Sequence, residues 1–240
     1  MDALTFLKKV TPYSKTINPF AVLCQCYHET KVKGVPWSSE LFVKANNGAG
    51  IKKWLHWPSP LYTKVSWEQS SIGTKYNKSS DFCLYPSVDV FIQNYVMKID
   101  TSYPLCKAYK DNFLGYFNGL ISGPYKWATD KEYFTRLVEA SLELAPSVFG
   151  VGTAWRQKYL NALEYAIQNR YISAEQEEII LQLLKKKNVI VTPIDKINAI
   201  PKTLICIDPG HGGTDPGASS DGVLEKDCTR IFGEALGRGF

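Results

Sequence analysis

A carboxylic acid near the start of the chain has the sequence surroundings of a general acid. Glu29 follows Val22 and Cys26 at helical spacing, so these three residues share one face of a helix. An apolar face buries the carboxyl group, and burial raises the pKa of a carboxylic acid. An acid that stays protonated near neutral pH can protonate a leaving oxygen, as glycoside hydrolysis requires. On a lone helix, pairing with Lys31 or solvation would be the more common role.

His211 and Glu225 form a second group that could do chemistry. Residues 203–207 read as a short apolar strand that enters a glycine-rich loop, with His211 after the strand and Glu225 opening the next helix. An imidazole and a carboxylate are common zinc ligands, and a catalytic zinc needs about three protein ligands plus an open water position. The histidines of the chain are His28, His56 and His211. The sequence therefore supplies part of a zinc centre.

The pattern around Glu29 is mostly helical. Asn18 and Pro19 form an N-cap and a first-turn proline, which predicts a helix over residues 19–31. Residues 34–86 read as loops and a hairpin, with an extended piece at 61–67. We therefore expect an α+β fold, a mostly helical domain with a small β lobe. Helical periodicity returns in three later segments, which begin after Ser87, after Thr129 with a capping-box glutamate at 132, and after Thr153.

Two boundaries are predicted in the second half of the chain. Ser173 and Gln176 form a capping box that opens an amphipathic helix, and residues 188–202 mix β-branched residues with prolines, as a connection would. We predict a first domain at residues 1–172, a linker with an amphipathic helix at 173–202, and part of a second domain at 203–240.

Composition narrows the classes of function. The 240 residues are 45% hydrophobic and 21% charged with a net charge of +5, and no apolar run approaches the roughly 20 residues of a membrane span. The charge favours a polyanionic surface such as a bacterial wall, and no basic run with interleaved aromatics indicates nucleic-acid binding. We expect no membrane insertion, no signal peptide and synthesis in the cytoplasm. The six cysteines are expected to be reduced core thiols.

Five segments follow one another along the first part of the chain: Gln-Cys-Tyr-His-Glu-Thr at 25–30, Asn-Asn-Gly-Ala-Gly-Ile-Lys at 46–52, Ser-Trp-Glu at 66–68, Leu-Tyr-Pro-Ser at 84–87 and Trp-Ala-Thr-Asp at 127–130. They resemble, in order, the motifs of glycoside hydrolase family 73, bacterial β-N-acetylglucosaminidases with a lysozyme-like fold. The resemblance covers residues 18–170 and implies that Glu29 is the general acid, that the enzyme cleaves the β-1,4 bond after N-acetylglucosamine in the glycan strand of peptidoglycan, and that no metal is needed.

The same resemblance assigns further residues. Glu68 would be the second carboxylate, with Asp81 as its competitor, and a surface glutamate is the plain alternative for Glu68. The family has tyrosine where this chain has Trp127, which can stack on a sugar but lacks the hydroxyl, and Tyr125 could supply that group. The expected substrate-binding residues are Asn47, Tyr85, Tyr125 and Trp127.

Residues 205–218, together with Gly222 and residues 225–227, resemble the start of the zinc-dependent type 3 N-acetylmuramoyl-L-alanine amidases. The resemblance implies an α/β zinc amidase fold in which His211 and Glu225 bind zinc, while a third ligand, a histidine, and a catalytic glutamate come from sequence beyond residue 240. We expect an incomplete zinc site and no amidase activity from these residues.

Two other functions stay open at this stage. A muramidase or lytic transglycosylase would share the lysozyme-like fold and a helix-borne glutamate, and a non-catalytic wall-binding or phage tail module would tolerate the Trp127 departure. Two lytic domains in tandem without a signal peptide favour a phage or prophage lysin, which acts on the wall after release or as part of a phage particle. The sequence leaves the oligomeric state undetermined.

Overall fold

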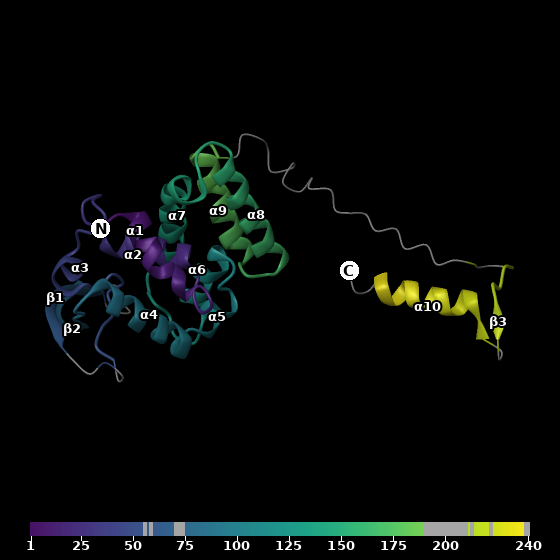
Figure 1. Cartoon of the computed structure of the whole chain (residues 1–240), viewed down its shortest axis with the longest axis horizontal. Coiled ribbons are helices and arrows are strands. Elements are labelled where there is room, and N and C mark those ends of the chain that lie inside the picture. Colours follow the sequence, from purple (N-terminus) through teal and green to yellow (C-terminus); the bar gives the residue numbers. More distant parts are fainter. Residues whose placement is uncertain are drawn as a thin grey trace. The chain divides into compact units, whose positions relative to one another are not determined.

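The polypeptide divides into two units, Met1–Ile190 and Val191–Phe240. The structure, a computed structural model, describes residues 1–54, 57, 60–69, 75–189, 211, 214–220 and 223–237, with the backbone alone described at 66–69, 75–76 and 232–237. Figure 1 shows the first unit as a group of helices with a two-stranded hairpin at one edge. This arrangement is α+β and mostly helical with a small β lobe, as predicted. Its helices are α1 (Ala3–Val10), α2 (Pro19–Thr30), α3 (Glu40–Ala45), α4 (Val88–Ser102), α5 (Pro104–Ala108), α6 (Phe113–Ser122), α7 (Tyr133–Phe149), α8 (Ala154–Gln168) and α9 (Ala174–Lys186).

Helix α2 runs through the core of this unit. The Asn18 side chain accepts a hydrogen bond from the Ala21 amide at 2.9 Å, and Pro19 occupies the first turn, which confirms the predicted helix start. Every residue from Phe20 to Tyr27 is buried, because α1, α6 and α7 all pack against α2. The helix therefore places Glu29, in its last turn, at the edge of the core, where its side chain is partly buried.

The β lobe is an antiparallel hairpin. Strand β1 (Leu61–Gln69) pairs with β2 (Lys75–Cys83), from Leu61 opposite Cys83 to Gln69 opposite Lys75. The hairpin is tied to α3, because the Tyr62 hydroxyl donates to Glu40 at 2.7 Å and Lys64 forms an ion pair with Glu40 at 3.4 Å. The extended segment predicted at 61–67 is confirmed, whereas α3 was not anticipated inside the loop-rich region.

Helix α7 begins at Tyr133, so the capping box predicted from Thr129 was wrong. Glu132 takes the N-cap position without a side-chain cap bond. The reason is Asp130, whose Oδ1 accepts from the Glu132 amide at 3.0 Å and whose other oxygen pairs with Arg136 at 2.8 Å. These contacts hold residues 130–132 in a turn and delay the helix.

Helix α9 belongs to the first unit and not to the linker in which we placed it. Both bonds of the predicted capping box between Ser173 and Gln176 are present. The helix packs against α7, and the Ile180 and Leu184 side chains are fully buried. The first unit therefore extends past residue 172 to Ile190, because an apolar helix face needs a partner surface.

The second unit is described in part. It contains the short strands β3 (Ser219–Ser220) and β4 (Val223–Leu224), paired antiparallel, and α10 (Glu225–Gly237). Most of the predicted connection at 188–202 and the predicted strand at 203–207 lie outside the described residues. Within the described part of the chain, no helix is long and apolar enough to cross a membrane.

Candidate active site

Glu29 lies in the last turn of α2 and meets the first residue of α7. The Tyr133 hydroxyl donates a hydrogen bond to Glu29 Oε1 at 2.6 Å. Tyr133 is 4% exposed and therefore has a fixed position beneath the carboxyl group. The second carboxyl oxygen, Oε2, faces Gly50, where an added Cβ would come to 4.0 Å from it. Among the described residues no other atom lies within 4 Å of that point, so the space between Gly50 and Oε2 is open, and the positive φ of 61° at residue 50 favours glycine there.

A buried chain of hydrogen bonds ends on this carboxyl group. Gln25 Nε2 donates to the Tyr133 hydroxyl at 3.0 Å, and Gln25 Oε1 accepts from the Tyr95 hydroxyl at 2.5 Å. The Tyr95 hydroxyl lies 3.2 Å from that of Tyr116. Since Tyr95 gives its proton to Gln25, Tyr116 is the donor in the last pair. Every donor in the chain consequently points toward Glu29.

Burial and this hydrogen bond act on Glu29 in opposite directions. Burial raises the pKa of Glu29 from its ordinary 4.5 to about 7, and the bond from Tyr133 opposes the rise. A carboxylic acid with a pKa near 7 is substantially protonated at neutral pH and can give up its proton readily. Because Oε1 already accepts from Tyr133, the acidic proton belongs on Oε2, on the side that Gly50 leaves open.

The Asn-Asn-Gly segment next to Glu29 is held by a residue that we predicted to bind substrate. Asn47 is 1% exposed, and its Nδ2 donates to the carbonyls of Ile51 and Cys83, each at 2.9 Å. Its Oδ1 accepts from the Ile51 amide at 2.9 Å. All of its side-chain hydrogen-bonding groups are engaged inside the protein, so Asn47 fastens the loop that carries Gly50 and does not face a ligand.

Tyr85, another predicted substrate-binding residue, is also buried inside the protein. Its side chain is 1% exposed, its hydroxyl donates to Asn94 Oδ1 at 2.6 Å, and its ring packs against Trp57 and Phe91. The predicted contact of Tyr85 with substrate therefore does not fit its burial. The motif residues 47 and 85 therefore hold the lobe next to the acid together through buried hydrogen bonds.

Trp127 and Tyr125 are close in sequence but differ in exposure. Trp127 is partly buried and packs against Tyr95 and Tyr103, with ring centroids 5.4 and 5.3 Å away. Tyr125 is 63% exposed and forms no hydrogen bond with Glu29. The hydroxyl that contacts the acid is that of Tyr133, which the sequence analysis did not single out, and the role of Tyr125 toward substrate stays a prediction. No local sequence signal marks Tyr133, because its contact with Glu29 depends on the packing of α7 against α2.

The two candidates for a second carboxylate lie on opposite strands of the hairpin. Glu68 is on β1 with its backbone opposite Tyr76, and its side chain lies outside the described part of the structure. Asp81 is on β2, exposed, and accepts from the Thr63 hydroxyl at 2.7 Å. In the described part of the structure neither Glu68 nor Asp81 contacts Glu29, so the identity of the second carboxylate stays a prediction.

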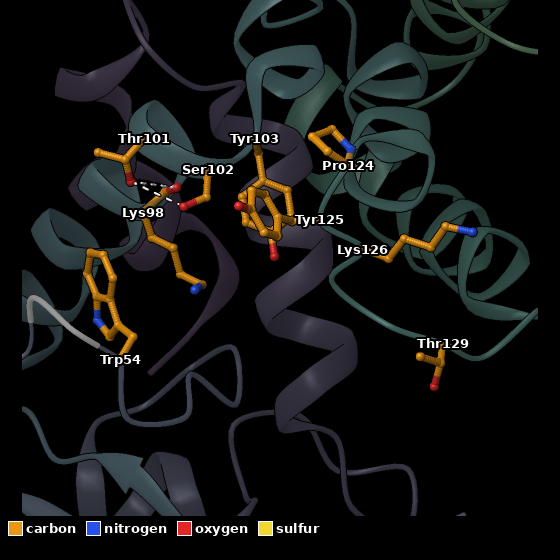
Figure 2. Close-up of a pocket in the computed structure, with 9 residues that line it drawn as sticks. All are labelled: Trp54, Lys98, Thr101, Ser102, Tyr103, Pro124, Tyr125, Lys126 and Thr129. Carbon is orange, nitrogen blue, oxygen red and sulfur yellow. Dashed lines mark hydrogen bonds between the residues drawn. The ribbon is translucent and has the colours of Figure 1, made fainter. Parts of the chain in front are cut away.

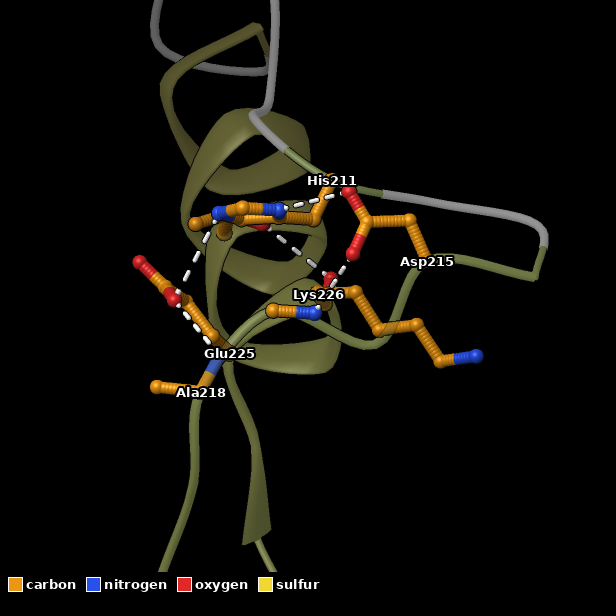
Figure 3. A network of polar contacts seen from close by, with 7 residues as sticks. His211, Asp215, Ala218, Glu225 and Lys226 are labelled. Carbon is orange, nitrogen blue, oxygen red and sulfur yellow. Dashed lines mark hydrogen bonds and ion pairs between the residues drawn. The ribbon is translucent and has the colours of Figure 1, made fainter.

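In the second unit His211 and Glu225 lie side by side, as Figure 3 shows. His211 Nε2 is 3.5 Å from Glu225 Oε2, while His211 Nδ1 contacts Asp215 at 2.9 Å. Glu225 Oε2 also accepts from the Ala218 amide at 2.9 Å. Gly217 makes this approach possible, since an added Cβ would lie 2.8 Å from both Glu225 Oε2 and His211 Cδ2.

This arrangement fits two corners of a zinc site. Ligand atoms about 2.0–2.1 Å from a tetrahedral zinc are separated by about 3.3 Å, close to the observed 3.5 Å between Nε2 and Oε2. Asp215 holds the other imidazole nitrogen, as carboxylates commonly do behind a zinc-bound histidine, and its hydrogen bond raises the pKa of His211. No cluster of three or more potential ligands occurs among the residues that the structure describes.

Residues 205–238 match the family model of N-acetylmuramoyl-L-alanine amidase, a stretch that lies within the second unit. No curated protein matches the chain. Among solved structures, the chain is similar to the catalytic domain of the autolysin Auto from Listeria monocytogenes, with 18% identity over 59% of this chain and 83% of that one and a TM-score of 0.46.

The chain is similar to two further solved structures. A peptidoglycan hydrolase mutant from Sphingomonas sp. A1 is 18% identical over 65% of this chain and 95% of that chain, with a TM-score of 0.46. The glycoside hydrolase domain of FlgJ from Salmonella typhimurium is 16% identical over 70% of this chain and 99% of that one, with a TM-score of 0.41. At TM-scores below 0.5, none of these likenesses assigns a function to the chain.

Proposed function

We propose that this chain is a peptidoglycan hydrolase whose first unit, a glucosaminidase of lysozyme-like fold, cleaves the β-1,4 bond after N-acetylglucosamine. The observation that carries the proposal is the Glu29 carboxyl group, whose pKa burial raises to about 7 and whose Oε1 is held by Tyr133 at 2.6 Å. The motif series that surrounds Glu29 in the sequence supports the choice of a glycan substrate. The enzyme would act on the cell wall, after release from the cytoplasm or as part of a phage particle.

The chemistry follows from the two carboxyl oxygens of Glu29. The proton on Oε2 moves to the glycosidic oxygen that enters the space beside Gly50, and the bond from that oxygen to the sugar C1 breaks. Tyr133 stabilises the carboxylate that remains. Water then adds its hydroxyl to C1, and its other proton replaces the one that Glu29 gave up. We assign the positioning of that water to Glu68, with Asp81 as the alternative.

Glu29→Gln tests the proposal, because an amide keeps the shape of the acid and can still accept from Tyr133 but has no acidic proton. Loss of the general acid should lower the rate of wall lysis by about 10²–10⁴-fold. Glu139→Gln is the matched control, since Glu139 is an exposed glutamate on α7. Near wild-type lysis by Glu29→Gln would refute the assignment. Identification of the sugar at the new reducing ends separates a glucosaminidase from a muramidase or a lytic transglycosylase.

A second candidate function concerns the second unit. The observation that favours it is the 3.5 Å approach of His211 to Glu225 within the segment that matches the amidase family model. We propose that these two residues would hold a zinc ion and that Asp215 orients the imidazole. Such an ion, when bound, activates water for hydrolysis of an amide bond. Zinc uptake measured by equilibrium dialysis should fall in His211→Ala and stay unchanged in a Lys8→Gln control.

A further inference from the structure

A pocket of about 720 Å³ lies in the first unit and includes none of the residues assigned to the acid. Figure 2 shows Trp54, Lys98 and Tyr125 around it, with Lys98 extending from α4 between the indole and the tyrosine rings. Three aromatic rings line the pocket, those of Trp54, Tyr103 and Tyr125, and the hydroxyls of Thr101, Ser102 and Thr129 add polar groups. Aromatic walls with a few polar groups are typical of small-molecule and sugar sites.

The charge of the pocket has one sign. Its charged lining residues are Lys98 and Lys126, and no acidic residue is among those that line it. The Lys98 ammonium lies 5.1 Å from the centroid of the Trp54 ring. Lys98 is partly buried, and burial lowers the pKa of its ammonium group. Among the described residues, no carboxylate forms an ion pair with Lys98. A partly desolvated cation of this kind gains from an anion that enters the pocket.

Two chain segments place the pocket near the acid. Gly50 faces Glu29, and Trp54, four residues later, lines the pocket. Thr129 lines the pocket, and Tyr133, four residues later, holds Glu29. Four residues of extended chain span at most about 14 Å. The pocket therefore lies within reach of a glycan strand whose glycosidic bond is at Glu29.

We infer that this pocket binds a sugar unit that carries a carboxylate, as N-acetylmuramic acid does through its lactyl group. The apolar face of the ring would pack on Tyr125 and Trp54, the hydroxyls at 102 and 129 would meet the ring oxygens, and Lys98 would pair with the carboxylate. Lys126, the other charged lining residue, is exposed. The inference rests on the proposed function, because it takes the glycan strand as the ligand.

Two monosaccharides test the inference without any bond to cleave. N-acetylmuramic acid and N-acetylglucosamine share a ring and differ by the lactyl carboxylate. We expect the 240-residue chain to bind the first about fivefold more tightly at low salt, in a titration followed by ligand-observed NMR, since a partly exposed ion pair is worth up to about that factor. Lys98→Gln should abolish the preference, and Lys98→Arg should keep it because the positive charge remains.

Controls separate charge from shape. Lys8→Gln removes an exposed lysine outside the pocket and should leave the preference unchanged. Tyr125→Ala should weaken the binding of both sugars alike, and because the Tyr125 side chain is 63% exposed the substitution should leave the fold intact. Equal binding of the two sugars to the wild type, or a preference that survives in Lys98→Gln, would overturn the inference, as would tighter binding of a glycerol phosphate oligomer. Because neither monosaccharide is hydrolysed, failure of wall lysis and failure of this preference are separate results.

Discussion

The acid in the first unit and the histidine–glutamate pair in the second are built in different ways. Glu29 takes its properties from residues far apart in sequence, since Tyr133 on α7 reaches it across 104 positions. His211, Asp215 and Glu225 come from a single short stretch, and the contacts among them span at most 14 positions. One site depends on a core, the other on a local turn.

The difference follows from the chemistry that each site needs. A general acid must have its pKa raised by burial, and only a packed domain removes a carboxyl group from water. A metal ligand needs only the correct separation of donor atoms, which Gly217 and the Ala218 amide provide locally while His211 stays exposed. Two donor atoms can therefore be set in place by a short segment, whereas the environment of Glu29 requires the whole first unit.

The largest effect in the hairpin is expected from the second carboxylate. If Glu68 positions the attacking water, Glu68→Gln should lower the rate of glycan cleavage by about 10²-fold, whereas Asp81→Asn should lower it only a few fold. New reducing ends released from purified walls are the measurement. If Asp81→Asn lowers the rate more than Glu68→Gln does, Asp81 on β2 is the second carboxylate.

A second prediction concerns stability and needs no substrate. Because the folded pKa of Glu29 is raised, the protonated form is favoured by folding, and stability is lost as pH rises from the ordinary pKa of 4.5 through about 7. At about 1.4 kcal/mol per unit, this loss approaches about 3 kcal/mol above pH 7. Glu29→Gln has no such charge to bury. Urea unfolding at pH 4 and pH 8 should show the wild type weakening relative to Glu29→Gln, and a constant difference would mean that the carboxyl group is solvated.

Removal of the Tyr133 hydroxyl should have a smaller effect. In Tyr133→Phe the carboxylate loses a donor at 2.6 Å, so the pKa of Glu29 rises further. The alkaline limb of the pH–rate profile should move to higher pH, and the rate at neutral pH should fall several fold because the acid gives up its proton less readily. Tyr27→Phe is the matched control, since the Tyr27 hydroxyl donates to Glu143 instead. If the alkaline limb does not shift, Tyr133 does not control the pKa of Glu29.

The smallest effect is expected from a chelator. Carboxylate chemistry needs no metal, so release of reducing ends should be the same with and without it. His211 and Glu225 supply two ligands where about three are needed, and the 240-residue polypeptide should therefore release no peptide from muramic acid. Chelator-sensitive peptide release would show a completed zinc site, and chelator-sensitive sugar release would contradict a metal-free mechanism in the first unit.

Helix starts were predicted correctly where the capping residues lie close together in the sequence. Asn18 with Pro19, and Ser173 with Gln176, gave correct helix starts because each cap involves residues three apart or fewer. Thr129 failed because Asp130 competes for the same amide groups and forms a turn. The extent of the first unit could not be predicted, because the partner surface of α9 lies on α7.

For the site residues too, what depends on local sequence could be predicted, and what depends on packing could not. The partial burial of Glu29 could be predicted from helical spacing alone. Asn47 and Tyr85 were taken for substrate contacts because a motif records which residues are required and not what they touch, and both turn inward. Tyr133 was missed because its hydroxyl meets the acid only after α2 and α7 pack together.

The hydrogen-bond chain behind the acid joins four helices. Gln25 and Glu29 lie on α2, Tyr95 on α4, Tyr116 on α6 and Tyr133 on α7. Opening of one helix would leave buried polar groups of the others without partners, which couples the helices into one cooperative unit. Amides of α2, α4, α6 and α7 should then exchange with solvent deuterium in a single step of common free energy. The acid keeps its proton-donating state for as long as that unit stays closed, and loses it when the unit opens.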